Sequence, residues 1–118
     1  MFIAGKEISE PAINQLGEQK DLSMQAKVHY ISLVKSYTKK SQEEITLADK
    51  ATLAQLLDQI ATTYGKPFSA EVYDPIKKEV KPTFVVMVNG IHMDQLDGVK
   101  TALKDGDSII LMTLMTGG

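Results

Sequence analysis

Two glycines, Gly117 and Gly118, are the last residues of the sequence and follow an apolar run. Glycine is used where a backbone must bend freely or be approached closely by another molecule. One interpretation is therefore a chain end that enters a narrow site on a partner. The alternative is a frayed end without a role, because the last residues of most domains are poorly ordered. The choice depends on whether the rest of the chain builds a domain that presents this end.

Other side chains that could carry chemistry are few and scattered. The sequence has no cysteine, which excludes disulfides, thiolate metal sites and a cysteine nucleophile. His29 and His92 each stand alone in a predicted strand, so we expect surface or packing roles for both. Four aspartates lack the spacing of a calcium loop. We interpret them as residues of solvated turns: Asp94, Asp97, Asp105 and Asp107. We therefore predict no metal site and no catalysis by this chain alone.

The composition indicates one small domain. The chain has 118 residues, of which 43% are hydrophobic, enough for a single core. A formal net charge of -2 provides no basic field for nucleic acid. No apolar run approaches the ~20 residues that span a bilayer, and the first 24 residues do not resemble a secretory signal. We expect a cytoplasmic protein with no nucleic-acid partner and no membrane partner.

Residues 1–24 are predicted to be an N-terminal extension, and residues 25–118 the folded domain. In the extension, Ser9-Glu10-Pro11 is typical of a helix start. Ile13 and Leu16 would then share one face of a short helix, which is marginal by itself. Two alternatives stay open for the extension: a mobile segment, or a short helix docked on the domain.

The first half of the domain predicts a β-hairpin followed by a helix. Residues 27–34 are rich in β-branched and aromatic side chains, which is typical of a strand. The polar stretch after them is interpreted as a turn before a short strand at residues 44–47. Thr52 and Gln55 have the spacing of a capping box, and apolar residues then recur at helical spacing as far as Gly65. We predict one amphipathic helix that packs against the strands.

The second half predicts strands joined by tight turns. Residues 71–73 and 79–80 are interpreted as a small ribbon around a proline-containing turn. Residues 83–88 are the most strand-like run and lack clean alternation, as expected for a strand covered on both faces. Met87 is accordingly expected to fill the core. Asn89-Gly90 is typical of a two-residue hairpin turn, because both residues accept positive φ.

A short return strand at residues 91–93 and a last strand at residues 108–112 complete the pattern. The order of strand, strand, helix, strand, short strand and strand is that of a β-grasp domain. This is an α+β fold in which one main helix packs across a mixed sheet. If the last strand continues, Ile110, Met112 and Leu114 project to one side of it. That side is the candidate partner surface.

Three segments stand in an order that resembles a known family: Val86-Met87-Val88-Asn89-Gly90, Leu103–Ile109 and the terminal Gly117-Gly118. Together they resemble the ubiquitin-like sulfur carriers, above all the small subunit of molybdopterin synthase (MoaD), with the thiamine sulfur carrier (ThiS) as a relative. The likeness covers about residues 26–118. Two features depart from the family. Thr113-Leu114-Met115 stands where the small subunits often carry prolines, and the N-terminal extension has no counterpart.

This resemblance implies chemistry at Gly118. Its carboxylate would be adenylated by a partner enzyme of the ubiquitin-activating type that uses ATP and magnesium, and then converted to a thiocarboxylate that donates sulfur. Gly117 would let the chain end pass through the partner's narrow channel. No cofactor would be bound by this chain. In a molybdopterin synthase it would be the small sulfur-donating subunit, and the large subunit would bind the pterin precursor.

The residues expected to contact such a partner lie in the last strand and the tail: Ile110, Met112, Leu114, Met115 and Thr116. The same terminus fits a second class of function, a protein modifier joined through Gly118 to lysines of other proteins. A carrier for thiamine synthesis or tRNA thiolation, and a β-grasp interaction module with an incidental tail, are further alternatives.

Overall fold

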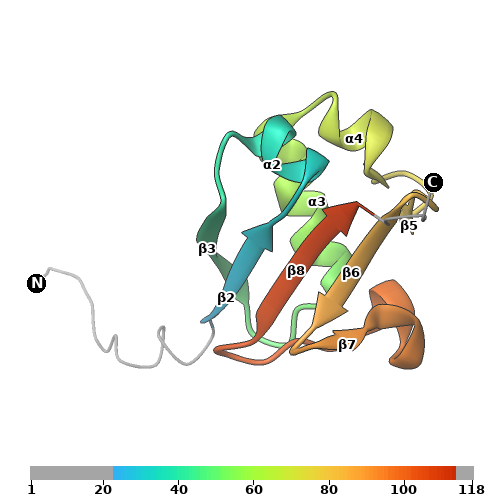
Figure 1. Cartoon of the computed structure of the whole chain (residues 1–118). Helices are drawn as coiled ribbons and strands as arrows, with labels where there is room; N and C mark the ends of the chain where they lie inside the picture. The colour runs from blue at the N-terminus through green and yellow to red at the C-terminus, as the bar shows by residue number, and fades with distance from the viewer. Residues whose placement is uncertain (1–22, 114–118) are drawn as a thin grey trace, which may run out of the picture.

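A mixed five-stranded sheet is the centre of the computed structural model, which describes residues 23–113 (Figure 1). Its strand order is β3-β2-β8-β6-β7. The strands are β2 (Ser23–Tyr30), β3 (Gln42–Ala48), β6 (Phe84–Val88), β7 (Ile91–His92) and β8 (Ser108–Thr113). β2 and β8 are parallel neighbours, and every other neighbouring pair in this sheet is antiparallel. This is the predicted β-grasp arrangement.

The described part of the chain begins two residues before the predicted boundary at residue 25. β2 starts at Ser23, and the Met24 side chain is already buried at 4% exposure. The two alternatives for the N-terminal extension concern residues that lie, apart from these two, outside the described part of the chain.

The first strand has the predicted length of eight residues but lies four residues earlier in the chain than predicted. β2 stops at Tyr30, and α2 (Leu33–Thr38) follows where the sequence predicted the end of a strand and a turn. Ser32 turns the chain with a φ of 60°. Val34 and Thr38, four residues apart, are then both buried, which is helical spacing. The prediction was wrong because the β-branched run hid this spacing. The predicted hairpin is confirmed, since β3 pairs antiparallel with β2.

The predicted amphipathic helix is α3 (Leu53–Tyr64), which crosses behind the sheet in Figure 1. Its capping box is present: Thr52 N donates to Gln55 Oε1 at 2.8 Å, and Gln55 N donates to Thr52 Oγ1 at 3.4 Å. The apolar stripe is fully buried: Leu53, Leu56, Leu57 and Ile60. Burying each of these side chains contributes about 1.5–3 kcal/mol, so the stripe fixes α3 on the sheet.

The connection after α3 contains the predicted ribbon and an additional helix. The ribbon consists of β4 (Tyr73–Asp74) and β5 (Glu79–Val80), so it is confirmed although its first strand starts two residues later than predicted. The sequence analysis missed α4 (Phe68–Glu71), a single turn whose Phe68 side chain is fully buried. A helix this short has no readable periodicity, and only the burial of Phe68 explains it.

β6 is covered on one face only. Phe84, Val86 and Val88 are buried, whereas Val85 and Met87 are half-buried on the opposite side. The expectation of a strand covered on both faces, with Met87 in the core, is therefore wrong. The continuous apolar run in β6 arises because the strand has apolar side chains both on the face that packs against α3 and on the opposite face.

The turn after β6 is the predicted one. Asn89 and Gly90 have φ values of 52° and 85°, which suit a two-residue hairpin turn. The return strand β7 ends at His92, one residue earlier than predicted, because Met93 begins a 3-10 turn (Met93–Gln95), and a second follows at Gly98–Lys100. Within residues 23–113, none of the helices has the length and apolar character needed to cross a membrane.

Candidate functional site

The central strand β8 positions the predicted reactive end of the chain. Its neighbours are β2 on one side and β6 on the other. Thr113, its last residue, pairs with Phe84, and its Oγ1 accepts a hydrogen bond of 3.3 Å from Leu33 N. The predicted site residues Leu114, Met115, Thr116, Gly117 and Gly118 follow this strand and lie outside the described residues. The structure therefore defines the platform from which they continue.

Two exposed apolar side chains flank the end of β8. Ile31 and Leu33, on either side of the turn at Ser32, are 40% and 46% exposed. Ile31 N donates to Leu111 O at 2.9 Å, which holds this corner against β8. Sequence reasoning missed both residues as site candidates because it placed them inside a strand. Only the turn at Ser32 brings Leu33 beside Thr113.

The face of the sheet opposite α3 carries a row of half-buried side chains, which come from four adjacent strands: His29, Ile110, Met87 and His92. The next row pairs Met112 with Val85, and both are half-buried. Directly paired residues share a face. Ile110 and Met112 therefore lie on the same side, as their alternation predicted. We call the set His29, Val85, Met87, Ile110 and Met112 the open sheet face.

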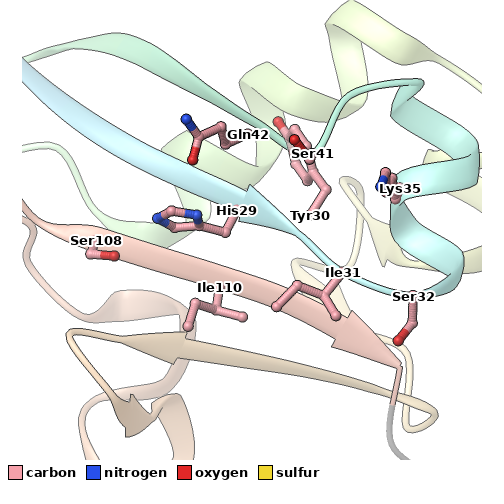
Figure 2. A pocket seen from close by; sticks show the side chains of 9 residues that line it. All are labelled: His29, Tyr30, Ile31, Ser32, Lys35, Ser41, Gln42, Ser108 and Ile110. Carbon is pink, nitrogen blue, oxygen red and sulfur yellow. The ribbon is translucent and has the colours of Figure 1, made fainter.

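A hollow of about 450 Å³ opens at one edge of this face, between β2, β8, the start of β3 and α2 (Figure 2). Figure 2 shows His29 and Ile110 on the neighbouring strands β2 and β8, where they are paired, and Lys35 on α2. Ile31 also lines the hollow, whose lining combines apolar and polar side chains. A depression lined in this way suits an inserted apolar side chain from another protein.

Tyr30, which lines the same hollow, is held by a hydrogen-bonded cluster. Its hydroxyl donates to Glu43 Oε2 at 2.6 Å, the Tyr64 hydroxyl donates to the same oxygen at 2.5 Å, and Lys40 Nζ lies 3.1 Å from Glu43 Oε1. The rings of Tyr30 and Tyr64 meet edge to face at 6.3 Å. This cluster joins β2, β3 and α3 beside the α2 corner.

The cluster perturbs the pKa values of its members. Burial raises the pKa of the Tyr30 hydroxyl, and the bond to the Glu43 carboxylate raises it further. Burial alone would raise the pKa of Glu43, but the bonds from Tyr30, Tyr64 and Lys40 outweigh it and hold that pKa below its ordinary value. These shifts favour a neutral Tyr30 and a charged Glu43, which is the state that the hydrogen bonds need.

The other sequence candidates have structural roles. His92 Nδ1 accepts a 3.0 Å bond from Asp94 N, so it caps the 3-10 turn that follows β7. Asp107 Oδ2 accepts from Lys104 N at 2.8 Å within the predicted turn, whereas Asp105 Oδ1 accepts from Gln25 N at 2.8 Å and so joins that turn to β2. In the region from 23 to 113, no three His, Asp or Glu side chains come close enough to hold a metal ion.

Comparisons with known proteins agree with this architecture. A family model described as the ThiS family matches residues 28–118. Small archaeal modifier protein 3 from Haloferax volcanii is 34% identical over 70 residues, which cover 59% of this chain and 73% of that protein. The matched region of the family model begins in β2 and includes both terminal glycines, so it spans the platform and the tail.

Solved structures give the same result for the fold. The solution structure of the Haloferax volcanii HVO 2177 protein has a TM-score of 0.68 at 26% identity, and the match covers 82% of this chain and 89% of that one. A putative molybdopterin converting factor, subunit 1, from Pyrococcus furiosus has a TM-score of 0.63 at 23% identity, with 78% and 99% covered. The second likeness shows a common fold.

Proposed function

The chain belongs to the ThiS family of ubiquitin-like sulfur carriers and small modifiers, and from this premise we propose that it is a sulfur carrier. The carboxylate of Gly118 is the carrier group. It is activated by an adenylating enzyme of the ubiquitin-activating type, converted to a thiocarboxylate, and used as a sulfur donor in molybdopterin synthesis. The observation that carries the proposal is the family match, which extends through Gly117 and Gly118.

The proposed chemistry overcomes the low reactivity of a carboxylate. A Gly118 oxygen attacks the α-phosphorus of ATP, and pyrophosphate leaves. A sulfur nucleophile at the oxidation level of sulfide then attacks the acyl carbon, and AMP leaves with the oxygen that held it. ATP and magnesium belong to the partner enzyme in this scheme, and this chain binds neither.

The geometry of β8 supports delivery of the chain end to such a partner. The last part of β8 is held by two hydrogen bonds, from Ile31 N to Leu111 O and from Leu33 N to Thr113 Oγ1, and by the pairing of Thr113 with Phe84. The position of Thr113, from which the chain continues to Gly118, is therefore fixed. Five further residues span at most ~17 Å when extended. The Gly118 carboxylate can therefore leave the domain and enter a neighbouring protein while the sheet stays folded.

The proposed partner contacts are the predicted ones. Ile110 and Met112 on the open sheet face would bind the adenylating enzyme, and Leu114, Met115 and Thr116 would line the entrance to its channel. If the product is molybdopterin, the large subunit of the synthase would use the same face after activation. Ile110 and Met112 are half-buried apolar side chains near the end of β8. They support this assignment, because a contiguous apolar patch on a protein surface marks an interface.

Molybdopterin synthesis is the pathway that we propose first because Val86–Gly90 and Leu103–Ile109 resemble segments of the synthase small subunit. Carriers for thiamine synthesis and for tRNA thiolation use the same terminal chemistry. The acceptor that takes the sulfur separates these pathways. A thiocarboxylated chain that supplies sulfur to a pterin precursor in the presence of the large subunit would assign it to the first.

A second function, protein modification, is favoured by a different observation. The 34% identical relative from Haloferax volcanii is named a small modifier protein. In that case the activated Gly118 acyl group would pass to a lysine amine of another protein instead of to sulfur. Both functions need the same adenylation step.

Intact mass measurement separates the two functions. The full chain is incubated with an adenylating enzyme from the same organism, ATP, magnesium and a sulfide source. The carrier gains the mass difference of one sulfur replacing one oxygen. Conjugates of higher mass with candidate target proteins indicate the modifier. A chain that forms neither product, and no acyl-adenylate, with any adenylating enzyme of that organism contradicts both proposals.

A further inference from the structure

We propose that the chain pairs with a second copy of itself through the outer edge of β3, so that the two sheets join into one. The inference does not rest on the proposed function. β3 lies at one end of the strand order, and no strand among residues 23–113 pairs with its outer edge (Figure 1). A row of unpaired backbone N–H and C=O groups at a sheet edge is a template for another strand.

The bonds between β2 and β3 identify the residues of β3 that point outward. Tyr30 N donates to Ser41 O at 2.9 Å, just before β3 begins. Bonded and non-bonded pairs alternate along an antiparallel ladder, so the backbone groups of Glu43, Ile45 and Leu47 face β2. The residues between them direct their backbone groups away from β2, and we call this set the outer edge: Gln42, Glu44, Thr46 and Ala48.

The outer edge lacks the features that keep exposed strands from pairing. Natural edge strands are very short, or carry proline, lysine or a bulge. β3 has seven residues without proline or lysine, and its register with β2 continues through all seven without a bulge. It ends at a turn in which Ala51 N donates to Ala48 O at 3.2 Å. β7, the strand at the other end of the sheet, has only two residues, so β3 is the edge at which a further strand adds.

One antiparallel register pairs the outer edge completely with itself. A twofold axis at Ile45 sets Gln42 opposite Ala48 of the second copy. The same axis sets Glu44 opposite Thr46 of the second copy, and each residue of the outer edge then has a backbone partner. A shift by two residues leaves an end residue unpaired. In one direction it also sets Glu44 opposite Glu44, and like charges directly opposite each other are destabilising.

The side chains of the outer edge also favour a second copy as the occupant. The Glu44 carboxylate has no hydrogen-bond or ion-pair partner among residues 23–113. Thr46 Oγ1 accepts a 2.8 Å bond from Gln25 Nε2, which leaves the hydroxyl hydrogen of Thr46 for another acceptor. Directly paired residues share a face of the sheet. The twofold register therefore brings each Thr46 hydroxyl to a Glu44 carboxylate, and it does so twice.

The test changes the charge opposite Glu44. Thr46→Lys sets an ammonium group opposite Glu44 of the second copy, and Thr46→Glu sets a carboxylate there. Both variants lose the bond from Gln25 equally. The matched controls, Gln95→Lys and Gln95→Glu, add the same charges at an exposed position after β7, at the other end of the sheet. Analytical ultracentrifugation of the full chain measures the dimer dissociation constant, and thermal unfolding checks that each variant is folded.

We expect the unaltered chain to form a dimer with a dissociation constant on the order of 0.1 mM, as suits a contact smaller than a standard interface. Thr46→Lys should lower this constant about fivefold and Thr46→Glu should raise it about fivefold, because the twofold axis repeats each new pair. Both Gln95 variants should match the unaltered chain. A chain that stays monomeric up to about 1 mM would overturn the inference. Thr46 variants that shift the constant in the same direction, or not at all, would also overturn it.

Backbone amide exchange locates the contact independently. The N–H groups of Gln42, Glu44 and Thr46 point outward, so their exchange with solvent should slow as the concentration rises through the dissociation constant. Those of Glu43 and Ile45 face β2, so they should already exchange slowly at the lowest concentration. NMR of the ¹⁵N-labelled full chain measures both sets. A dimer that forms without slower exchange at the outward residues would have its contact elsewhere, which rejects the proposed pairing.

Discussion

Glu43 joins three parts of the molecule through one carboxylate. Two tyrosine hydroxyls and Lys40 donate to it, and its side chain is only 19% exposed. Glu43→Gln removes the charge that these donors share, so we expect the free energy of unfolding to fall by about 1–3 kcal/mol at neutral pH. Urea unfolding measures the change. Glu44→Gln, at the exposed neighbouring position, is the control and should change stability by no more than about 0.5 kcal/mol.

The pH dependence of stability gives an independent check on the same cluster. The pKa of folded Glu43 lies below its ordinary value, which is near 4.3 in model peptides. The charged carboxylate therefore stabilises the fold fully above about pH 4.3, and this contribution is lost as the pH falls through the folded pKa. Stability of the unaltered chain should drop more steeply in this window than that of Glu43→Gln. Parallel curves would show that Glu43 is not preferentially charged in the folded state.

Gly117 should matter for activation and not for folding. A branched side chain at this position would widen the chain end that enters the partner's channel, so Gly117→Val should lower kcat/KM for adenylation by about a hundredfold, typical for a misplaced reacting group. Thermal unfolding of the variant should match that of the unaltered chain. Normal adenylation of Gly117→Val would remove the argument that the terminal glycines serve passage through a channel.

Local chemistry made several residues predictable. The helix cap formed by Thr52 and Gln55 and the turn formed by Asn89 and Gly90 each involve residues at most three positions apart in the sequence. Their spacing alone therefore indicates a cap and a turn. Ile31 and Leu33 could not be identified in this way. Their place beside Thr113 depends on the parallel pairing of two strands about 80 residues apart in sequence, and a residue pattern carries no such register.

The cap of α3 offers a test of element stability. Thr52→Ala removes the side-chain acceptor for Gln55 N, and we expect the free energy of unfolding to fall by about 1 kcal/mol. Thr62→Ala is the matched control in the same helix, because its hydroxyl bonds only back to the Asp58 carbonyl. It should be neutral or slightly stabilising, since alanine favours a helix interior. Chemical denaturation that ranks the two variants in the opposite order would contradict the role of the capping box.

β8 carries the proposed partner surface. Met112→Asp introduces a charge into the open sheet face, so we expect binding to the adenylating enzyme to weaken about tenfold or more, by the loss of a buried apolar contact. Calorimetric titration measures the affinity, and circular dichroism checks the fold. Gln59→Glu, at an exposed position of α3 behind the sheet, is the control that also adds one negative charge and should bind normally. Full affinity of Met112→Asp would place the partner surface elsewhere.

The one helix with strong periodicity was predicted correctly, and the two short helices were not. α3 has an apolar stripe over three turns and two clear ends, so it could be located from the sequence. α2 and α4 have six and four residues. Tertiary packing of Val34 and Phe68 decides their conformation, and local propensity is too weak to indicate it.

At the scale of the molecule, residues 23–113 form a sheet with two apolar faces and one principal helix. The order of elements predicted the β-grasp fold, because few topologies accommodate one helix between two hairpins. Which face stays open did not follow from the sequence. Apolar residues on both faces of β6 suggested two covered sides, whereas α3 covers only one.

The central claim is that the chain carries sulfur on its last residue, and the most direct measurement is tandem mass spectrometry of the chain after reaction with its adenylating enzyme, ATP and sulfide. We predict that the mass of one sulfur in place of one oxygen appears in the C-terminal peptide and is assigned to Gly118. The chain lacking Gly118 should unfold at the same temperature and acquire no sulfur. Sulfur at any other residue, or an equally thiolated deletion variant, would contradict the claim.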